Sequence, residues 1–212
     1  MDFIKSYKLI INDLTLFLLM SILCVSIGFA QNTNSEEFEN NLNDILFTRT
    51  TSYSELESLF YKFKNDSIKM QLLENKVVEA SYYEAESYAL NALGVIYRNL
   101  SMYDRAIEYH KYAEKIATYT ENLELKVLSL NMLGVAYRRM DLVSSALDYH
   151  SLAMEFAKTA NPINDELRFS IAVSLNGMGN IYLVLKQYDL ALEQFNKSLE
   201  ITTESYNKLG LA

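Results

Sequence analysis

The chain of 212 residues has no tryptophan, one proline and one cysteine, Cys24. Cys24 lies in an apolar N-terminal stretch, so the rest of the chain has no thiol for a disulfide or a cysteine-based metal site. Only two histidines occur, and the Walker, H-E-x-x-H and G-x-S-x-G motifs are missing. We therefore expect no cofactor, no metal centre, no catalytic residues and no enzymatic activity.

Positive charge is also scarce. Lysine and arginine number 19 against 27 aspartates and glutamates, which gives a net charge of −8. Affinity for nucleic acid depends on neutralising phosphates with lysine and arginine. The acidic balance therefore argues against nucleic acid and against a membrane surface as partners.

Residues 1–30 have the features of a secretory signal peptide. Two lysines precede an apolar run, and small residues stand three positions and one position before Gln31. We expect an exported protein, periplasmic or extracellular, with a flexible mature N-terminus over residues 31–44. The alternative is an uncleaved membrane anchor over residues 14–30, since about 18 apolar residues can span a bilayer.

One nine-residue pattern occurs three times in the rest of the chain. Its copies read LNALGVIYR, LNMLGVAYR and LNGMGNIYL at residues 90–98, 130–138 and 175–183. The motif glycines are spaced by 40 and 45 residues, and an alanine stands twelve residues after each of them. A fixed period of this length is typical of stacked helical units that bury their apolar faces against one another.

Helical periodicity around the three copies predicts an all-α solenoid of antiparallel helix pairs. The first helix of each pair is expected over residues 83–99, 122–139 and 165–185, and the second over 103–118, 143–158 and 188–204. The corresponding repeats cover residues 82–120, 121–160 and 161–205. Residues 45–81 are predicted to form two atypical capping helices, and 206–212 to begin a further helix, so we expect the natural chain to continue.

These recurring residues resemble the tetratricopeptide repeat. The pattern L-x-x-L-G-x-x-Y, followed in the second helix by an alanine and a small residue seven positions later, covers residues 90–113, 130–153 and 175–198. The period exceeds the nominal 34 residues and is similar to the extended repeats of kinesin light chain and of bacterial sensor proteins. The resemblance implies a right-handed superhelix that binds a protein or peptide on the concave face of the first helices.

The motif glycines predict close contact between the two helices of a pair. A glycine inside a helix costs about 1 kcal/mol relative to alanine, so three of them in register need a packing reason. We expect each glycine to meet the alanine twelve residues later. His110 and His150 occupy the position where the third repeat has Phe195, so we expect both histidines to be packing residues.

The face of each first helix opposite its apolar stripe is the predicted binding groove. An asparagine recurs there in all three repeats, and its amide can hold the backbone of an extended peptide of any sequence. The alternative is that each asparagine bonds a neighbouring helix and sets the stacking angle. Arginines on the same face can recognise carboxylates. The predicted groove residues are Tyr88, Asn91, Val95, Arg98, Asn131, Val135, Arg138, Arg139, Asn176 and Asn180.

The favoured function is a non-enzymatic protein-interaction scaffold that holds a peptide or a partner helix in this groove. An alternative is the N-terminal periplasmic sensory region of a bacterial histidine kinase or helix-turn-helix regulator, because arrays of this kind after a signal peptide look like such regions. The effector domain would then follow Ala212. A third reading is an adaptor in export or outer-membrane assembly.

Overall fold

The computed structural model describes residues 36–210, with side chains up to residue 204. The chain divides into two compact units, Met1–Asp44 and Ile45–Ala212. The signal peptide and the anchor predicted for the first thirty residues lie outside the described residues, so export stays a prediction. Among residues 36–210, no helix combines the length and the apolar character that a membrane crossing requires.

The first unit is described over residues 36–44 only. These residues are helical, and the helix runs on to residue 48. The structure thus has a helix from residue 36 onward, where a flexible segment is expected from the sequence. Phe38, Leu42 and Ile45 follow the apolar period of a helix, and the many polar residues between them concealed that pattern.

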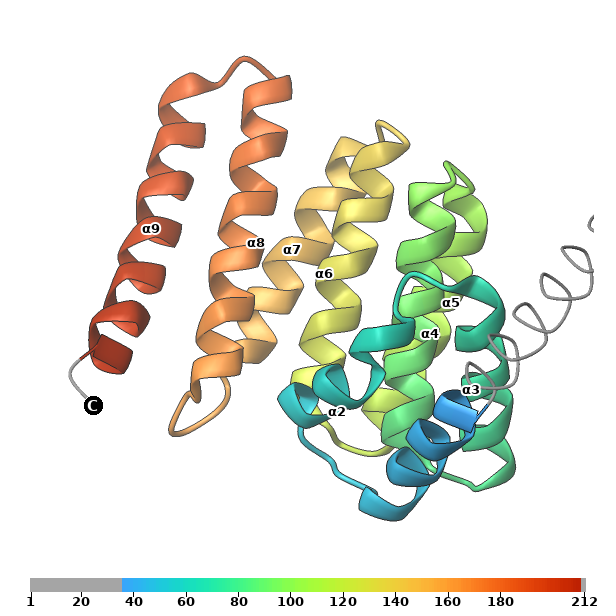
Figure 1. Cartoon of the computed structure of the whole chain (residues 1–212). Helices are drawn as coiled ribbons and strands as arrows, with labels where there is room; N and C mark the ends of the chain where they lie inside the picture. Colours follow the sequence, from blue (N-terminus) through green and yellow to red (C-terminus); the bar gives the residue numbers. More distant parts are fainter. Residues whose placement is uncertain (1–35, 211–212) are drawn as a thin grey trace, which may run out of the picture. The chain divides into compact units, whose positions relative to one another are not determined.

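The second unit contains three helical hairpins that stand side by side (Figure 1). We call their first members the A helices: α4 (Tyr83–Asn99), α6 (Leu123–Arg139) and α8 (Asp165–Val184). Their second members, the B helices, are α5 (Tyr103–Tyr119), α7 (Val143–Ala157) and α9 (Tyr188–Gly210). Each A helix packs against its own B helix and against a neighbouring A helix; α6 and α8 also pack against the preceding B helix, and α4 packs against the helix before it, α3 (Ser67–Glu79). This confirms the predicted all-α solenoid of helix pairs, and residues 36–210 contain no strand.

Most of the turns between these helices share one backbone geometry. At the end of α4, the N–H of Ser101 donates to the carbonyl of Arg98 (3.0 Å) and the N–H of Met102 to that of Tyr97 (2.9 Å). This is a Schellman motif, which needs a residue in the left-handed conformation. The residues with positive φ at these turns are Ser81, Ser101, Glu121, Asp141 and Lys186.

The segment before α4 contains two α-helices, as predicted, but they do not form a hairpin. It forms α2 (Tyr53–Phe60), a short turn of 3-10 helix at Tyr61–Phe63, and α3 (Ser67–Glu79). α3 packs along α4 and covers the first face of the array, whereas α2 packs against α4 instead of pairing with α3 (Figure 1).

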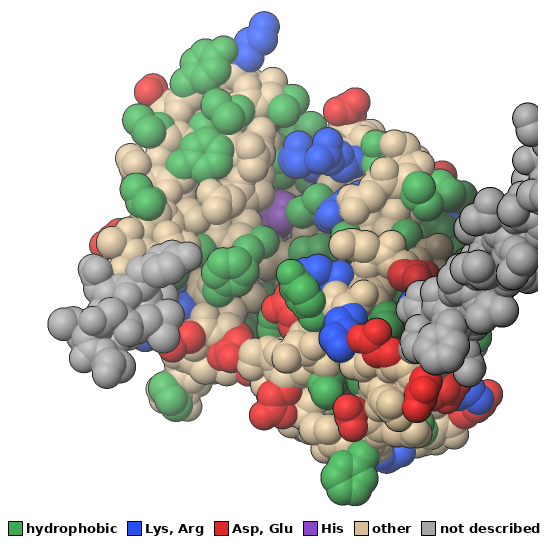
Figure 2. Space-filling model, viewed as in Figure 1, with side chains coloured by type: hydrophobic (Ala, Val, Ile, Leu, Met, Phe, Trp, Pro, Cys, Tyr) green, Lys and Arg blue, Asp and Glu red, His purple; other side chains and the backbone are tan. Residues whose placement is uncertain are grey.

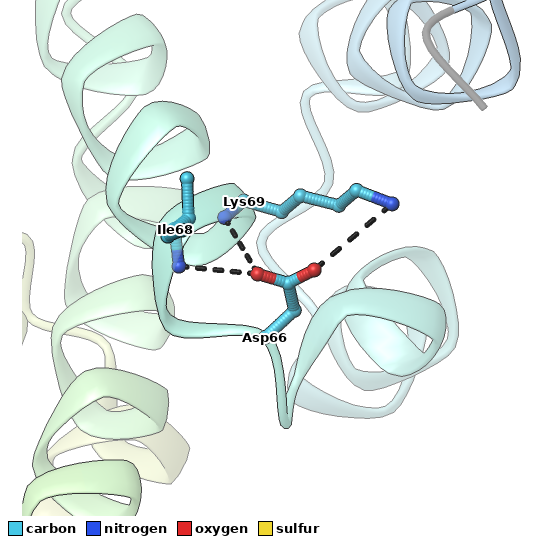
Figure 3. A network of polar contacts seen from close by, with 3 residues as sticks. All are labelled: Asp66, Ile68 and Lys69. Carbon is cyan, nitrogen blue, oxygen red and sulfur yellow. Dashed lines mark hydrogen bonds and ion pairs between the residues drawn. The ribbon is translucent and has the colours of Figure 1, made fainter. Parts of the chain in front are cut away.

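Asp66 fixes the start of α3. Its Oδ1 accepts from the N–H groups of Ile68 (3.1 Å) and Lys69 (3.0 Å), and its Oδ2 lies 4.0 Å from the Lys69 ammonium (Figure 3). An aspartate at this position accepts hydrogen bonds from amides that the first turn of the helix leaves unpaired. Its negative charge also interacts favourably with the positive end of the helix dipole. The chain therefore changes direction between Phe63 and α3, and α2 packs against α4.

The last helix corrects the predicted start of a further helix at residue 206. α9 runs without a break from Tyr188 to Gly210. No proline or glycine interrupts the chain between these two residues, so nothing ends the helix earlier. Residues 211–212 lie outside the described residues.

Candidate functional site

Each motif glycine lies against a ring of its B helix. A Cβ atom added to Gly94 would lie 2.4 Å from the His110 ring, and one added to Gly134 would lie 2.8 Å from the His150 ring. The predicted close contact is confirmed, but its partner is the ring sixteen residues after the glycine. The alanine twelve residues after each glycine is buried and does not occupy this contact.

His150 is enclosed on both sides. Besides Gly134 of its own repeat, Gly177 on α8 faces the ring so closely that an added Cβ would lie 2.3 Å from Nε2. The equivalent contact in the third repeat pairs Gly179 with Phe195, at 2.6 Å from an added Cβ. The ring position is thus a packing position, as the sequence predicts.

A polar contact joins the first two repeats across the A layer. His110 Nδ1 lies 2.9 Å from the amide oxygen of Asn91. The Asn91 amide nitrogen donates to the hydroxyl of Ser129 on α6 (2.8 Å). We call this set of residues and its counterpart in the next repeat the polar trios.

The second polar trio joins α6, α7 and α8. His150 Nδ1 lies 2.9 Å from the amide oxygen of Asn131, and the Ser174 hydroxyl donates to the same oxygen (2.8 Å). The Asn131 amide nitrogen donates to the backbone carbonyl of Ser170 (3.0 Å). Both trios therefore connect one helix pair to the next A helix.

The polar trios overturn the prediction that Asn91 and Asn131 grip a ligand. Their side chains are 3% and 1% exposed, and their amides bond to neighbouring helices. The prediction assumed one buried stripe and an open opposite face. In this stack an A helix has neighbours on three sides, so the contacts support the alternative role in stacking.

Both trio histidines are neutral at pH 7. The amide oxygen can only accept, so Nδ1 carries the proton, and Nε2 has no hydrogen-bond partner among the residues that the structure describes. Burial, with a smaller effect of Arg98, lowers the pKa of His110 to about 3. Burial and Arg138 lower the pKa of His150 to about 4. A neutral ring behaves much like the phenyl group of Phe195.

The A-helix face holds two cavities, one of about 250 Å³ and one of about 120 Å³. Both are lined by Tyr53, Leu128 and Met132. The predicted residues Tyr88, Asn91 and Val95 line the larger one, and Asn131 lines the smaller one. The lining of these cavities is mostly apolar, with Glu57 and Lys64 among the residues of the larger one, and the described residues form no ladder of free amides there.

The three predicted groove arginines come together at the C-terminal ends of α4 and α6. Burial, and then the neighbouring charges of Arg139 and Arg138, lower the pKa of Arg98. Burial and Arg139 likewise lower the pKa of Arg138. None of the three forms an ion pair with a described carboxylate, and the Arg98 guanidinium donates to the sulfur of Met132 (3.9 Å). Figure 2 shows basic side chains beside the hollow of this face.

The remaining predicted residues have other surroundings. Asn176 and Asn180 on α8 are exposed, and the Asn180 amide donates to the Asn176 carbonyl (2.8 Å). Val135 on α6 is half-buried. Only the asparagines of the third repeat therefore face solvent.

Sequence reasoning missed a second polar row, at the N-terminal ends of the A helices. Asn122 and Asn164 cap α6 and α8 through their side-chain oxygens, and a glutamate follows each of them two residues later. Asn122 and Glu124 also contact the backbone ahead of α2. The recurrence of asparagine and glutamate at the same offset is the signal that identifies this row.

Comparison with known proteins supports the helical-repeat architecture. A family model described as tetratricopeptide repeat matches residues 172–205. The crystal structure of BtubC (BKLC) from P. vanneervenii is similar, with a TM-score of 0.57 and 15% identity over 71% of this chain and 60% of that chain. At this identity the likeness shows the fold alone, and the chain spans 60% of the length of that protein. No curated protein matches.

The chain is therefore a tetratricopeptide-repeat-like protein. Repeats of this kind generally mediate protein–protein interactions, and their fold is generally non-catalytic. The repeats thus suggest a protein-interaction scaffold. Similarity to kinesin light chain and to histidine-kinase sensory regions stays a prediction.

Proposed function

We propose that the A-helix face binds an acidic segment of a partner protein, with carboxylates at Arg98, Arg138 and Arg139 and apolar side chains in the larger cavity. The observation that carries this proposal is the arginine cluster without a described carboxylate partner. The guanidinium groups of Arg98 and Arg138 are partly buried and lie near the exposed Arg139. An added anion stabilises like charges in a partly desolvated site, because the surrounding dielectric is low.

The chemistry of the neighbouring wall specifies the rest of the partner. Val95, Leu128 and Met132 give the cavity an apolar lining next to the arginines. A ligand that combines leucine or phenylalanine with glutamate or aspartate satisfies both features. Arginine forms bidentate hydrogen bonds with carboxylates, and hydrogen bonds to charged groups contribute about 1.5–3 kcal/mol each.

A paired peptide array tests the proposal. Each apolar 12-residue peptide is synthesised twice, with glutamate and with glutamine at the same positions. We expect the full chain to prefer the glutamate series. The double variant Arg98→Gln with Arg138→Gln should lose this preference, with affinity for the glutamate series falling about 10- to 100-fold.

The matched control removes two charges from the outer helices. Lys115 on α5 and Lys158 after α7 are exposed, and Lys115→Gln with Lys158→Gln should keep the full preference. Equal binding of the two peptide series by the unmodified chain, or equal losses in the two double variants, would refute the proposal.

A further inference from the structure

The backbone ahead of α2 is held by side chains from the N-terminal ends of two A helices. The Tyr82 hydroxyl donates to the Thr50 carbonyl (2.6 Å), and the Asn122 amide donates to the Thr51 carbonyl (2.8 Å). The N–H of Tyr53 donates to a carboxylate oxygen of Glu124 (3.1 Å). Contacts to backbone groups of an extended strand are the means by which a receptor holds a peptide with little regard to its sequence.

α2 then lies on the A-helix face with three apolar side chains toward it. The Tyr88 ring on α4 meets Tyr53 and Phe60, with centroids 6.0 and 5.0 Å apart. Leu56 and Phe60 are fully buried. Tyr53, Leu56 and Phe60 therefore form the i, i+3, i+7 series that is typical of an amphipathic helix bound in a groove.

α2 depends on this contact for its helical state. It has eight residues, and isolated helices shorter than about 12–15 residues are marginal in water. Its N-cap residue Ser52 makes no side-chain capping bond. An element that gains its structure mainly by docking can open without unfolding the helix pairs behind it.

From these contacts we infer that the surface beneath α2 is a partner-binding surface, occupied in this state by the chain's own Thr50–Phe60 segment. The partner that it fits has the same construction: an extended stretch of about four residues, followed by a short helix with an aromatic or leucine side chain at i, i+3 and i+7. Such a partner binds in exchange for α2. This inference rests on the proposed function, since it extends the same face, but it does not involve the three arginines.

Binding of the segment in trans tests the inference. The probe is a fluorescently labelled synthetic peptide with the sequence of residues 50–65, and fluorescence anisotropy is measured with the full chain. In the variant Leu56→Asp with Phe60→Asp, the two buried charges should displace the chain's own α2 segment from the surface. We expect this variant to bind the peptide at least about tenfold more tightly than the unmodified chain, because a receptor filled by its own segment is only fractionally available.

Two controls make the result specific. A peptide carrying the same two aspartates should not bind, and adding Tyr88→Ala to the opened variant should abolish binding of the unmodified peptide. If the opened variant, with unchanged circular dichroism, binds the peptide no more tightly than the unmodified chain, α2 is a permanent part of the fold and the inference is wrong.

A measurement on the unmodified chain covers the case in which the opened variant does not fold. Amide hydrogen exchange should show residues 53–60 exchanging at least about tenfold faster than the buried turns of α4 and α6. Equal protection of α2 and these helices would overturn the inference. The peptide-array test of the arginines is unaffected by either result, so failure here and failure of the proposed function are distinguishable.

Discussion

The first two repeats and the third repeat carry the same motif with different consequences. Asn91 and Asn131 are buried in the polar trios, whereas the equivalent Asn176 is exposed. One turn into the B helix, Ile107 is 8% exposed and the equivalent Leu192 is 59% exposed. A later A helix packs on each of the first two repeats, whereas no described helix follows α9 to cover the third. The role of a motif residue is therefore set by its neighbour in the stack and not by the motif alone.

The ring position shows the same difference. His110 and His150 bond an asparagine that in turn contacts the next A helix, whereas Phe195 in the third repeat makes no such bond and is only half-buried. Histidine thus occurs at this position in the two repeats whose asparagine is used for stacking. The polar trio is a contact between repeats, added to packing that phenylalanine supplies equally well.

The largest expected effect comes from placing a side chain at the motif glycine of the second repeat, on which the A helix of the third repeat packs. Gly134→Leu should lower the free energy of unfolding by about 3 kcal/mol or more, because His150 is held between Gly134 and Gly177 and has no room to move. Gly179→Leu should cost less, since Phe195 is half-buried and can shift outward. Urea titrations followed by circular dichroism measure both values, and equal losses would count against the comparison.

The buried histidines should make the protein sensitive to acid. Their pKa values of about 3 and about 4 lie below the unfolded value near 6.5, so the unfolded state binds protons first as the pH falls. The contribution of each histidine to stability is fully present above about pH 6.5. Below that pH it decreases by about 1.4 kcal/mol per pH unit.

His150→Phe should remove one of the two contributions. Between pH 7.5 and 4.5, the variant should lose about 2–3 kcal/mol less stability than the unmodified chain. Subtracting the two denaturation series cancels the carboxylates that both proteins share. An unchanged pH dependence would show that His150 is not buried as a neutral ring.

Removing the motif asparagine should have different effects in the second and third repeats. Asn131→Ala should cost about 2 kcal/mol, since it leaves the buried Nδ1–H of His150 without its acceptor, whereas the Ser174 hydroxyl can still donate to the Ser170 carbonyl (3.0 Å). Asn176→Ala, on an exposed surface, should change stability by no more than about 0.5 kcal/mol. Thermal melts of the two variants give the comparison, and similar melting temperatures would argue against the stacking role.

The smallest effect concerns the turns. Asp141 has a φ of 59°, a conformation that costs most residues about 1–2 kcal/mol and glycine very little. Asp141→Gly should therefore raise stability by about 1 kcal/mol. The control is Thr159→Gly after α7, where φ is not positive, and which should give no gain. Stabilisation by both variants alike would point to a cause other than the left-handed turn.

The helix pairs were predictable from the sequence because their signals are local. Residues 83–99 form α4 as predicted, and α6 starts one residue later than expected because Asn122 is its cap. The sequence also indicated that the arginines at the ends of α4 and α6 share one face, and their charges do act on one another there.

What the sequence did not disclose depends on contacts between distant segments. The backbone ahead of α2 meets Asn122 and Glu124 across 71 positions of the chain, and no local pattern announces such a contact. The burial of Asn91 and Asn131 likewise comes from the next A helix. A helical wheel drawn for one helix assigns a single buried stripe and cannot include that neighbour.

A double-mutant cycle on Asn131 and Ser174 tests the account most directly. The two residues lie on consecutive A helices and share one hydrogen bond of 2.8 Å. The free energies of unfolding of Asn131→Ala, Ser174→Ala and the double variant should give a coupling energy of about 1 kcal/mol. Strict additivity of the two substitutions would mean that the amide does not join the repeats, and would restore Asn131 as a candidate for ligand binding.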